Sequence, residues 1–306
     1  MPLILPPALP AIKVLQDENI FVMRHERAME QDIRPLEILV VNLMPDKIVT
    51  ETQLARMLAN SPLQVRLTFL RTGTHESRHT PQQHIGAFYI TLPEIESHRF
   101  DGAIITGAPI ELMPFEEVDY WEELCSLFDY CRKNVYSNIY LCWGALAALY
   151  HHYGLPKEIY SEKLHGVFEH RVERPGNPLV RGFDECFYVP HSRSAGIPRQ
   201  EVEKVPQLRV LADSEEAGLH LLSTENGREI YIMGHMEYDK ETLLNEYERD
   251  TAAGLAPPLP QHYFVDDDPK KGVLFRWRSH GHLLYSNWLN YYVYQETPFD
   301  LNNLHE

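Results

Sequence analysis

Cys142 occupies a position from which a thiolate could act as a nucleophile. The apolar stretch NIYL leads into Cys142, and Trp143 and Gly144 then precede the helix-forming residues ALAALY. A strand, a tight turn and a helix in this order are typical of a nucleophile elbow, which lifts the side chain above the carboxyl end of a sheet. The helix N-terminus favours thiolate over thiol, and the next backbone N–H can donate to an oxyanion. The alternative is a buried structural cysteine.

His235 and Glu237 provide a matching base and carboxylate. They follow the strand-like stretch REIYIM and Gly234. Because parallel strands deliver their carboxyl ends to one side of a sheet, we expect His235 to face Cys142. Glu237 could accept the second imidazole N–H and stabilise the imidazolium that forms when the thiol proton moves. A solvated His and Glu on a surface turn are the alternative, but together with the elbow they predict a catalytic triad.

The other cysteines and the histidines suggest no second chemistry. Cys125 and Cys131 lie in a helical pattern and Cys186 precedes a strand-like stretch, so we interpret all three as structural. Four cysteines without a CxxC pair are too few for a disulfide framework, and we expect reduced thiols. Sixteen histidines are present without an HExxH motif, so we predict no metal site and keep metal binding as a minor alternative.

Strand-like and helical segments alternate along the chain. Residues 36–45, LEILVVNLMP, form an apolar run typical of a buried parallel strand, and residues 51–60 show helical periodicity. Alternation of this kind implies right-handed crossovers and a parallel sheet. Further strands are expected at 63–70, 100–109, 208–214, 218–224 and 228–235, and further helices at 118–133, after Cys142, at 237–255 and at 282–298.

These segments predict an α/β fold with a doubly wound, mostly parallel sheet flanked by helices, of the flavodoxin-like type. Residues 1–35 are punctuated by prolines and are expected to lie over the domain as an arm rather than to form an early strand. Residues 36–298 show no clear linker or repeat and are interpreted as a single α/β domain, followed by a tail at 299–306.

The composition argues against two classes of protein, those that bind nucleic acids and those that span membranes. Lys and Arg number 28 against 44 Asp and Glu in 306 residues, a formal net charge of −16, which argues against a nucleic-acid partner. No apolar run approaches the roughly 20 residues that a bilayer span needs, so we expect no membrane association. The N-terminal residues lack the pattern of a signal peptide. The chain is therefore expected to be cytoplasmic.

The sequence resembles the homoserine O-acyltransferases of methionine biosynthesis, which have the class I glutamine amidotransferase-like fold. The resemblance covers nearly the whole chain. Its motifs are ENIFVM (18–23), NLMPDK (42–47), ITGAPIE (105–111), CWGALAALYHHYG (142–154), KLHGVFEH (163–170), PHSR (190–193), GHMEYD (234–239), YERD (247–250) and WRSHGHLLYSNWLNYYVYQETP (277–298).

The resemblance implies a ping-pong reaction. Cys142 would take an acyl group from a coenzyme A thioester and pass it to the hydroxyl of L-homoserine, without a resident cofactor. His235 would accept first the thiol proton and later the hydroxyl proton, with Glu237 as its orienting group.

The same motifs imply a substrate site. Lys163, Ser192 and Arg249 fall on substrate-binding positions of the family. A guanidinium suits the carboxylate of an amino acid, and Glu246 could take the ammonium group. The alternative for Glu246 and Arg249 is an exposed ion pair between residues i and i+3 of a helix.

Two further assignments concern the acyl donor. On geometric grounds the N–H of Trp143 and a backbone N–H near Gly107 or Ala108 are candidates for the oxyanion hole. NLMPDK has Asp46 where many members of the family carry a second lysine, which leaves Lys47 as the cationic candidate there for a coenzyme A phosphate.

Glu111 falls on the position that discriminates between acetyl and succinyl donors in the family. If its carboxylate lines the acyl pocket, a succinyl carboxylate would meet a like charge. Two such charges about 4 Å apart at an effective dielectric of about 20 repel by roughly 4 kcal/mol. The resemblance therefore implies acetyl-CoA as the donor, unless Glu111 faces solvent.

Two other functions use the same residues differently. A glutamine amidotransferase would use the Cys, His and Glu set to release ammonia, but it needs a synthetase partner that this sequence does not resemble. A binding protein with a redox-sensing or inert cysteine belongs to a different class, and acyl labelling of Cys142 would argue against it. The oligomeric state stays open, and a homodimer is compatible with the sequence.

Overall fold

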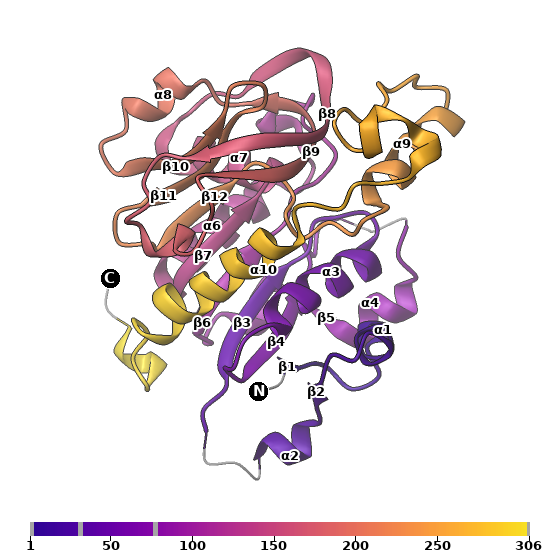
Figure 1. Cartoon of the computed structure of the whole chain (residues 1–306). Helices are drawn as coiled ribbons and strands as arrows, with labels where there is room; N and C mark the ends of the chain where they lie inside the picture. The colour runs from indigo at the N-terminus through magenta and orange to yellow at the C-terminus, as the bar shows by residue number, and fades with distance from the viewer. Residues whose placement is uncertain (1–2, 30–32, 76–78, 305–306) are drawn as a thin grey trace.

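The computed structural model describes residues 3–29, 33–75 and 79–304 (Figure 1). Its centre is a 12-stranded mixed sheet with the strand order β2-β1-β4-β3-β6-β7-β12-β11-β10-β8-β9, and β5 pairs with β4. The strands are β1 (Leu3–Ile4), β2 (Val22–Met23), β3 (Leu36–Val41), β4 (Val65–Leu70), β5 (Tyr89–Ile90), β6 (Phe100–Ile105), β7 (Val135–Leu141), β8 (Glu158–Val172), β9 (Cys186–Gly196), β10 (Leu208–Ser214), β11 (Gly218–Thr224) and β12 (Glu229–Ile232).

The sheet has a parallel part and an antiparallel part. All pairings from β2 through β12 in the strand order are parallel, as is β4 with β5. The pairings of β12 with β11, β11 with β10, β10 with β8 and β8 with β9 are antiparallel. The predicted mostly parallel α/β sheet is therefore confirmed, and the antiparallel strands extend it on one side.

Helices cover both faces of the parallel part (Figure 1). The α-helices are α1 (Pro10–Asp17), α2 (His25–Met29), α3 (Lys47–Ala59), α4 (Gln82–Phe88), α5 (Leu92–Ile95), α6 (Trp121–Asn134), α7 (Trp143–Tyr153), α8 (Arg199–Glu203), α9 (Thr242–Ala252) and α10 (Arg278–Asn287), which continues as the π-helix η5 (Trp288–Tyr294). Among the helices in the described residues, none combines the length and hydropathy that a bilayer crossing requires.

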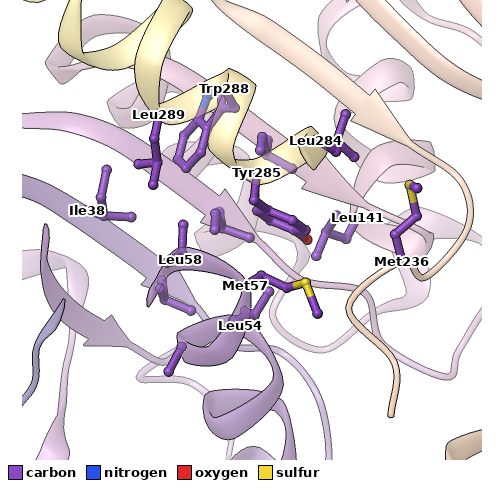
Figure 2. Packing of buried hydrophobic residues seen from close by; sticks show 14 of the residues in the cluster. Ile38, Leu54, Met57, Leu58, Leu141, Met236, Leu284, Tyr285, Trp288 and Leu289 are labelled. Carbon is purple, nitrogen blue, oxygen red and sulfur yellow. The ribbon is translucent and has the colours of Figure 1, made fainter. Parts of the chain in front are cut away.

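The two cores explain why the strands are continuously apolar. In β3, Ile38 and Val40 pack in one core and Leu39 and Val41 in the other, because successive side chains of a strand point to opposite faces. Helices α3, α10 and η5 cover the first face (Figure 2), and α6 and α7 cover the second. Figure 2 labels ten residues of the first core: Ile38, Leu54, Met57, Leu58, Leu141, Met236, Leu284, Tyr285, Trp288 and Leu289.

The N-terminal segment differs from the prediction. Residues 3–4 form β1, which pairs with β4, and residues 22–23 extend the sheet as β2. The expectation that residues 1–35 contain no strand was therefore wrong, because two-residue strands are set by pairing partners distant in the chain rather than by a local pattern. Residues 1–2 and 30–32 of this arm, and 305–306 of the tail, lie outside the described residues.

The antiparallel hairpin of β8 and β9 is the largest element that the sequence analysis did not identify. Its strands pair from Arg171 with Cys186 to Glu158 with Gly196, with an irregularity between Ile159 and Leu164. Polar and charged residues are frequent along β8, and its first seven residues are exposed or half-buried, so it has no long apolar run. The hairpin matters because it carries Lys163 and Ser192.

Candidate active site

Cys142 lies at the turn between β7 and α7, as the elbow pattern predicts. Its backbone has φ 49° and ψ −117°, a conformation that non-glycine residues rarely adopt. The Cys142 N–H donates to the carbonyl of Ile232 at 2.7 Å, which fixes the turn against the end of β12. The residue is only 5% exposed, so its sulfur is sheltered at the carboxyl edge of the sheet.

The turn is closed by glycines on two neighbouring segments. A Cβ on Gly144 would lie 2.5 Å from the carbonyl oxygen of Thr106, so α7 can begin this close to the end of β6 only with glycine there. A Cβ on Gly107 would lie 3.3 Å from both Cys142 Cβ and Trp143 N. The backbone after β6 therefore passes directly beside the sulfur-bearing residue.

His235 and Glu237 follow β12 and lie beside Cys142. The His235 Nδ1 atom is 2.7 Å from Glu237 Oε1, and both residues are 4% exposed. The negative charge of the Cys142 sulfur also acts on the imidazole and raises the pKa of His235. The His235 backbone N–H donates to the carbonyl of Pro190 at 2.8 Å, which holds the base against β9. The three residues thus form a continuous line from sulfur to carboxylate.

Burial by itself lowers the pKa of His235, because a buried imidazolium loses hydration. The negative charges of Cys142 and Glu237, together with the hydrogen bond to Glu237, more than compensate and hold the pKa well above its usual value. A protonated ring between a thiolate and a carboxylate is the charge state expected of an activated cysteine.

Tyr238 fixes the orientation of this ring from one side. Its ring stacks on that of His235 with centroids 4.2 Å apart and an interplanar angle of 14°. The Tyr238 hydroxyl donates to Glu246 Oε1 at 2.9 Å. Sequence reasoning did not single out Tyr238, although its place in the GHMEYD motif was a usable signal.

The predicted substrate residues lie on three neighbouring elements. Lys163 on β8 has its Nζ atom 3.3 Å from Asp250 Oδ2, and Ser192 on β9 stands in register with His165. Arg249 on α9 pairs with Asp250 through its Nε at 2.8 Å, and its side chain is 64% exposed. An ion pair of Arg249 with Glu246 was the alternative, but Glu246 instead accepts from Tyr238 and Arg249 binds Asp250.

Glu111 lies in the turn that follows β6, within electrostatic reach of the triad. Burial raises the pKa of its carboxyl group, and the carboxylate of Glu246 adds to the effect. A backbone hydrogen bond and the nearby charges of Lys163 and His235 act in the opposite direction. The residue is half-buried, so its carboxylate is partly withdrawn from water beside the reactive groups.

The structure does not support the prediction that Lys47 binds a coenzyme A phosphate. Lys47 is 6% exposed, and its Nζ donates to the carbonyls of Asn42 at 2.5 Å and Met44 at 3.2 Å. Burial lowers its pKa to about 8, while Glu51 partly restores it. We correct the assignment to a structural one, because the ammonium group is enclosed by the loop that begins α3. Asp46 caps this helix by accepting from the N–H of Val49.

The other cysteines lack the surroundings of a nucleophile. Burial is the main cause that raises the pKa of the Cys125 thiol to about 11, and burial raises that of Cys131 further. Cys186 is half-buried at the start of β9. All four cysteines are free thiols.

Three buried histidines, His170, His191 and His220, lie close together, and one ring nitrogen of each is within 4.8 Å of those of the other two. The hydrogen bonds around His191 do not suit a cation. Arg193 Nε donates to His191 Nδ1 at 3.3 Å, so the His191 proton is on Nε2, which faces His170 Nε2 at 3.1 Å. His170 Nδ1 then donates to the carbonyl of Phe168 at 3.0 Å. The pattern fits a chain of neutral rings ending at a guanidinium.

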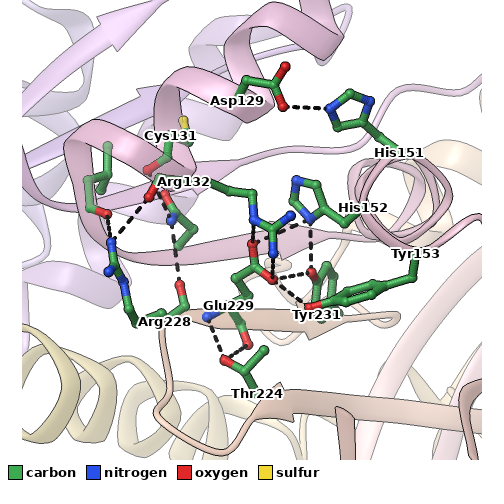
Figure 3. A network of polar contacts seen from close by, with 12 residues as sticks. Asp129, Cys131, Arg132, His151, His152, Tyr153, Thr224, Arg228, Glu229 and Tyr231 are labelled. Carbon is green, nitrogen blue, oxygen red and sulfur yellow. Dashed lines mark hydrogen bonds and ion pairs between the residues drawn. The ribbon is translucent and has the colours of Figure 1, made fainter. Parts of the chain in front are cut away.

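A second polar cluster lies at the opposite, amino-terminal edge of the sheet (Figure 3). Glu229 at the start of β12 accepts from the hydroxyls of Tyr153 at 2.8 Å and Tyr231 at 3.0 Å, and Arg132 Nε is 2.8 Å from its other oxygen. Arg228 donates to backbone carbonyls around the start of β7. These contacts tie α6 and α7 to the sheet, so we interpret the cluster as structural.

Comparison with known proteins identifies the family. Residues 2–299 match the family model described as HTS, homoserine O-succinyltransferase. The chain belongs to the homoserine O-acyltransferase family. A protein named homoserine O-acetyltransferase from Acetivibrio thermocellus is 55% identical over 304 residues, which cover 99% of this chain and 100% of that protein. A protein of the same name from Clostridium acetobutylicum is 55% identical, over 98% of this chain and 100% of that protein. Another from Bacteroides thetaiotaomicron is 52% identical, over 99% of this chain and 100% of that protein.

Solved structures show the fold of this acyltransferase family member. A glutamine amidotransferase from Thermotoga maritima superposes with a TM-score of 0.55 at 11% identity, covering 84% of this chain and 97% of that one. A glutamine amidotransferase from Methylobacillus flagellatus gives a TM-score of 0.51 at 10% identity, covering 84% and 95%. The expected glutamine amidotransferase-like fold is therefore confirmed.

Proposed function

We propose that this chain is a homoserine O-acetyltransferase that moves the acetyl group of acetyl-CoA to the hydroxyl of L-homoserine through a thioester on Cys142. The observation that carries the proposal is the placement of Cys142 beside His235, which is itself hydrogen-bonded to Glu237, at the carboxyl edge of the sheet. Full-length identity of 52–55% to proteins named homoserine O-acetyltransferase supports the substrates.

In the first half-reaction, the Cys142 thiolate attacks the carbonyl carbon of the acyl-CoA thioester while His235 holds the former thiol proton. The new carbon–sulfur bond forms as the carbonyl electrons move to oxygen. We assign the N–H of Trp143 and a backbone N–H near Gly107 or Ala108 to that oxyanion; the closeness of Gly107 to Trp143 N, 3.3 Å from a Cβ built on the glycine, supports the assignment. When the oxyanion collapses, the coenzyme A thiolate leaves and takes the proton from His235.

In the second half-reaction, neutral His235 accepts the proton of the homoserine hydroxyl as its oxygen attacks the acetyl-thioester. The carbon–oxygen bond forms, the carbon–sulfur bond to Cys142 breaks, and the thiolate returns beside the imidazolium. Glu237 holds the ring through its Nδ1–H in both steps, at the observed 2.7 Å.

The acceptor would lie between α9 and the hairpin of β8 and β9. We assign Arg249 to the substrate carboxylate, with Lys163 and Ser192 as further polar contacts and Glu246 to the ammonium group. Asp250, which pairs with both Lys163 and Arg249, would hold these two cations apart and in place. A guanidinium that is already oriented by one carboxylate loses less entropy when it binds another.

The acetyl donor is proposed from Glu111. Its half-buried carboxylate, within electrostatic reach of His235, would oppose a succinyl carboxylate arriving at Cys142. The family model carries the succinyl name and the similar relatives carry the acetyl name, so the donor must be decided for this chain on its own residues.

Initial rates with homoserine and each acyl donor test the proposal. Acetyl-CoA should give parallel double-reciprocal lines, and succinyl-CoA should be used far less well. Intersecting lines would argue against a thioester intermediate. Ammonia release from glutamine without acyl transfer would favour the glutamine amidotransferase alternative.

We further propose that residues 36–298 act as one acyltransferase domain. The four free thiols suit the reducing cytoplasm, where we infer that the enzyme works. Homodimer formation stays a prediction, which sedimentation of the purified protein would test.

A further inference from the structure

His165 lies near Lys163 and Glu246, which are assigned to the acceptor, and has no role in the mechanism above. It is on β8, two residues after Lys163, and the charge of Lys163 acts on its ring. It is 2% exposed, and its backbone carbonyl accepts from the N–H of Gln261 at 2.9 Å. This pairing fixes the backbone of β8 at His165.

The hydrogen bond on one side of the ring determines its tautomer. His165 Nδ1 is 3.0 Å from the carbonyl oxygen of Pro258, and a carbonyl can only accept. Nδ1 therefore carries the proton, and Nε2 of the neutral ring presents a lone pair. Burial lowers the pKa of His165, and Lys163 lowers it further, whereas the Pro258 carbonyl, Glu246 and Asp250 raise it in part. The ring is neutral near pH 7.

The free lone pair faces a carboxylate oxygen that also lacks a partner. His165 Nε2 and Glu246 Oε2 are 4.0 Å apart, and both are buried without a hydrogen bond to any described residue. Tyr238 already occupies the other oxygen of Glu246. Two buried acceptors that face each other are costly unless a donor lies between them.

The separation of these two atoms suits one nitrogen with several N–H groups. A nitrogen placed about 2.8–2.9 Å from each of two acceptors that are 4.0 Å apart makes an acceptor–nitrogen–acceptor angle of about 90°. This angle is close to the angle between two N–H bonds of an ammonium group. The carboxylates of Glu246, Asp250 and Glu111 favour a cation there, and the opposing charge of Lys163 is paired with Asp250.

We propose that His165 is a substrate-binding residue that selects for α-amino acids, because its Nε2 and Glu246 Oε2 together accept hydrogen bonds from the α-ammonium group of the acyl acceptor. The proposal rests on the proposed function, since it assigns one subsite of that reaction. It predicts that the enzyme distinguishes homoserine from acceptors of the same length that lack the amino group.

The test is His165→Asn, compared with the wild type and with His165→Gln. The Asn amide can still donate to the Pro258 carbonyl but is too short to replace Nε2, whereas the Gln amide can place an oxygen near Nε2. For His165→Asn we expect kcat/KM for homoserine to fall roughly 10- to 100-fold, the loss of one hydrogen bond to a charged group. His165→Gln should recover part of it.

Two further measurements separate binding from structure. Exchange of labelled coenzyme A into acetyl-CoA, measured without homoserine, reports the first half-reaction and should change less than about threefold in both variants. With 4-hydroxybutanoate, which lacks the amino group, wild type and His165→Asn should have equal kcat/KM.

An equal loss of activity with homoserine and 4-hydroxybutanoate would overturn the role of His165 and point to a bound water or a structural contact between it and Glu246. If His165→Asn does not fold, His165→Leu takes its place, and a loss of kcat/KM with homoserine that is absent with 4-hydroxybutanoate supports the proposal. A nonselective loss in His165→Leu overturns it. Failure of the proposed function is a separate result, because the wild type would then show no coenzyme A exchange.

Discussion

His235 Nδ1 and Glu237 Oε1 are joined at 2.7 Å although the two residues belong to one short turn after β12. Base and orienting carboxylate are therefore placed by the same backbone segment, and only the nucleophile comes from another strand. A displacement of this turn would move His235 and Glu237 together relative to Cys142. Catalysis therefore depends on the contacts that hold the turn in place as well as on the three catalytic residues.

Glu237→Gln should separate orientation from charge. The amide keeps the size of the side chain but no longer stabilises the imidazolium, so we expect kcat to fall by on the order of 10²- to 10⁴-fold. The pKa of His235 should also fall, because one of the two negative charges that raise it is lost. Steady-state rates across pH would measure both effects.

The matched control for this variant is Glu215→Gln, which changes an exposed glutamate in the turn between β10 and β11. It should keep wild-type rates. Wild-type turnover in Glu237→Gln would remove Glu237 from the mechanism.

Glu111→Gly should open the acyl site to succinyl-CoA. Removing the carboxylate relieves a repulsion of roughly 4 kcal/mol, so the preference for acetyl over succinyl donors should fall by several hundredfold. Glu111→Gln keeps the bulk without the charge and tells repulsion from crowding. The kcat/KM values for the two donors are the measurement, and an unchanged ratio in both variants would show that Glu111 decides nothing.

Gly234→Ala should disturb the turn that carries the base. A Cβ there would lie 2.4 Å from Val189 Cγ1 and 2.8 Å from the ring of His191. We expect the free energy of unfolding to fall by about 1–3 kcal/mol and kcat to fall at least about tenfold, because His235 is the next residue. Denaturant titration and steady-state rates would report the two effects.

Gly176→Ala is the matched control, since a Cβ at that position meets no atom within 4 Å. It should leave both quantities unchanged. If Gly234→Ala keeps wild-type kcat, the close packing of this turn is not what positions the base.

Acid should destabilise the protein through its buried neutral histidines. Burial lowers the pKa of His152 and of His170 to about 3, and lowers those of His191 and His220 well below the usual value. Below pH 6.5 the unfolded chain binds protons that the folded chain excludes, so stability falls as pH falls from 6.5 towards 3. Each such histidine costs about 2 kcal/mol at pH 5. His235, with a raised pKa, opposes the trend.

Denaturant unfolding at pH 7, 6 and 5 would measure this loss. His152→Gln should show a smaller decrease between pH 7 and 5 than the wild type, whatever its stability at pH 7. A free energy of unfolding that is constant from pH 7 to 5 would contradict the assignment of neutral rings.

Local sequence patterns were enough to predict the nucleophile elbow and the edge of the sheet at which the base lies. The order of strand, turn and helix around Cys142 is set by neighbouring residues, and the ends of parallel strands bring His235 to the same edge. Short strands such as β1 could not be predicted, because they exist only through pairing with β4. The long β8 was missed for a related reason, since its polar residues are held by β9 and β10.

Side-chain burial was the least predictable feature. The sequence predicts an accessible cation at Lys47, but its ammonium group donates hydrogen bonds to the carbonyls of Asn42 and Met44. The helix begins at Lys47 because Asp46 caps it, and this aspartate had been interpreted only as the replacement of a lysine. His165 could have been found from its spacing to Lys163, but nothing local shows that Pro258 fixes its tautomer.

The account depends on an acyl group carried by the sulfur of Cys142. Peptide mass spectrometry of the protein mixed with acetyl-CoA, without homoserine, tests this most directly. We predict one acetyl group on the peptide that contains Cys142, its loss on addition of homoserine, and no labelling or turnover in a Cys142→Ala variant that folds normally. An acetyl group on another residue, or full turnover by Cys142→Ala, would contradict the account.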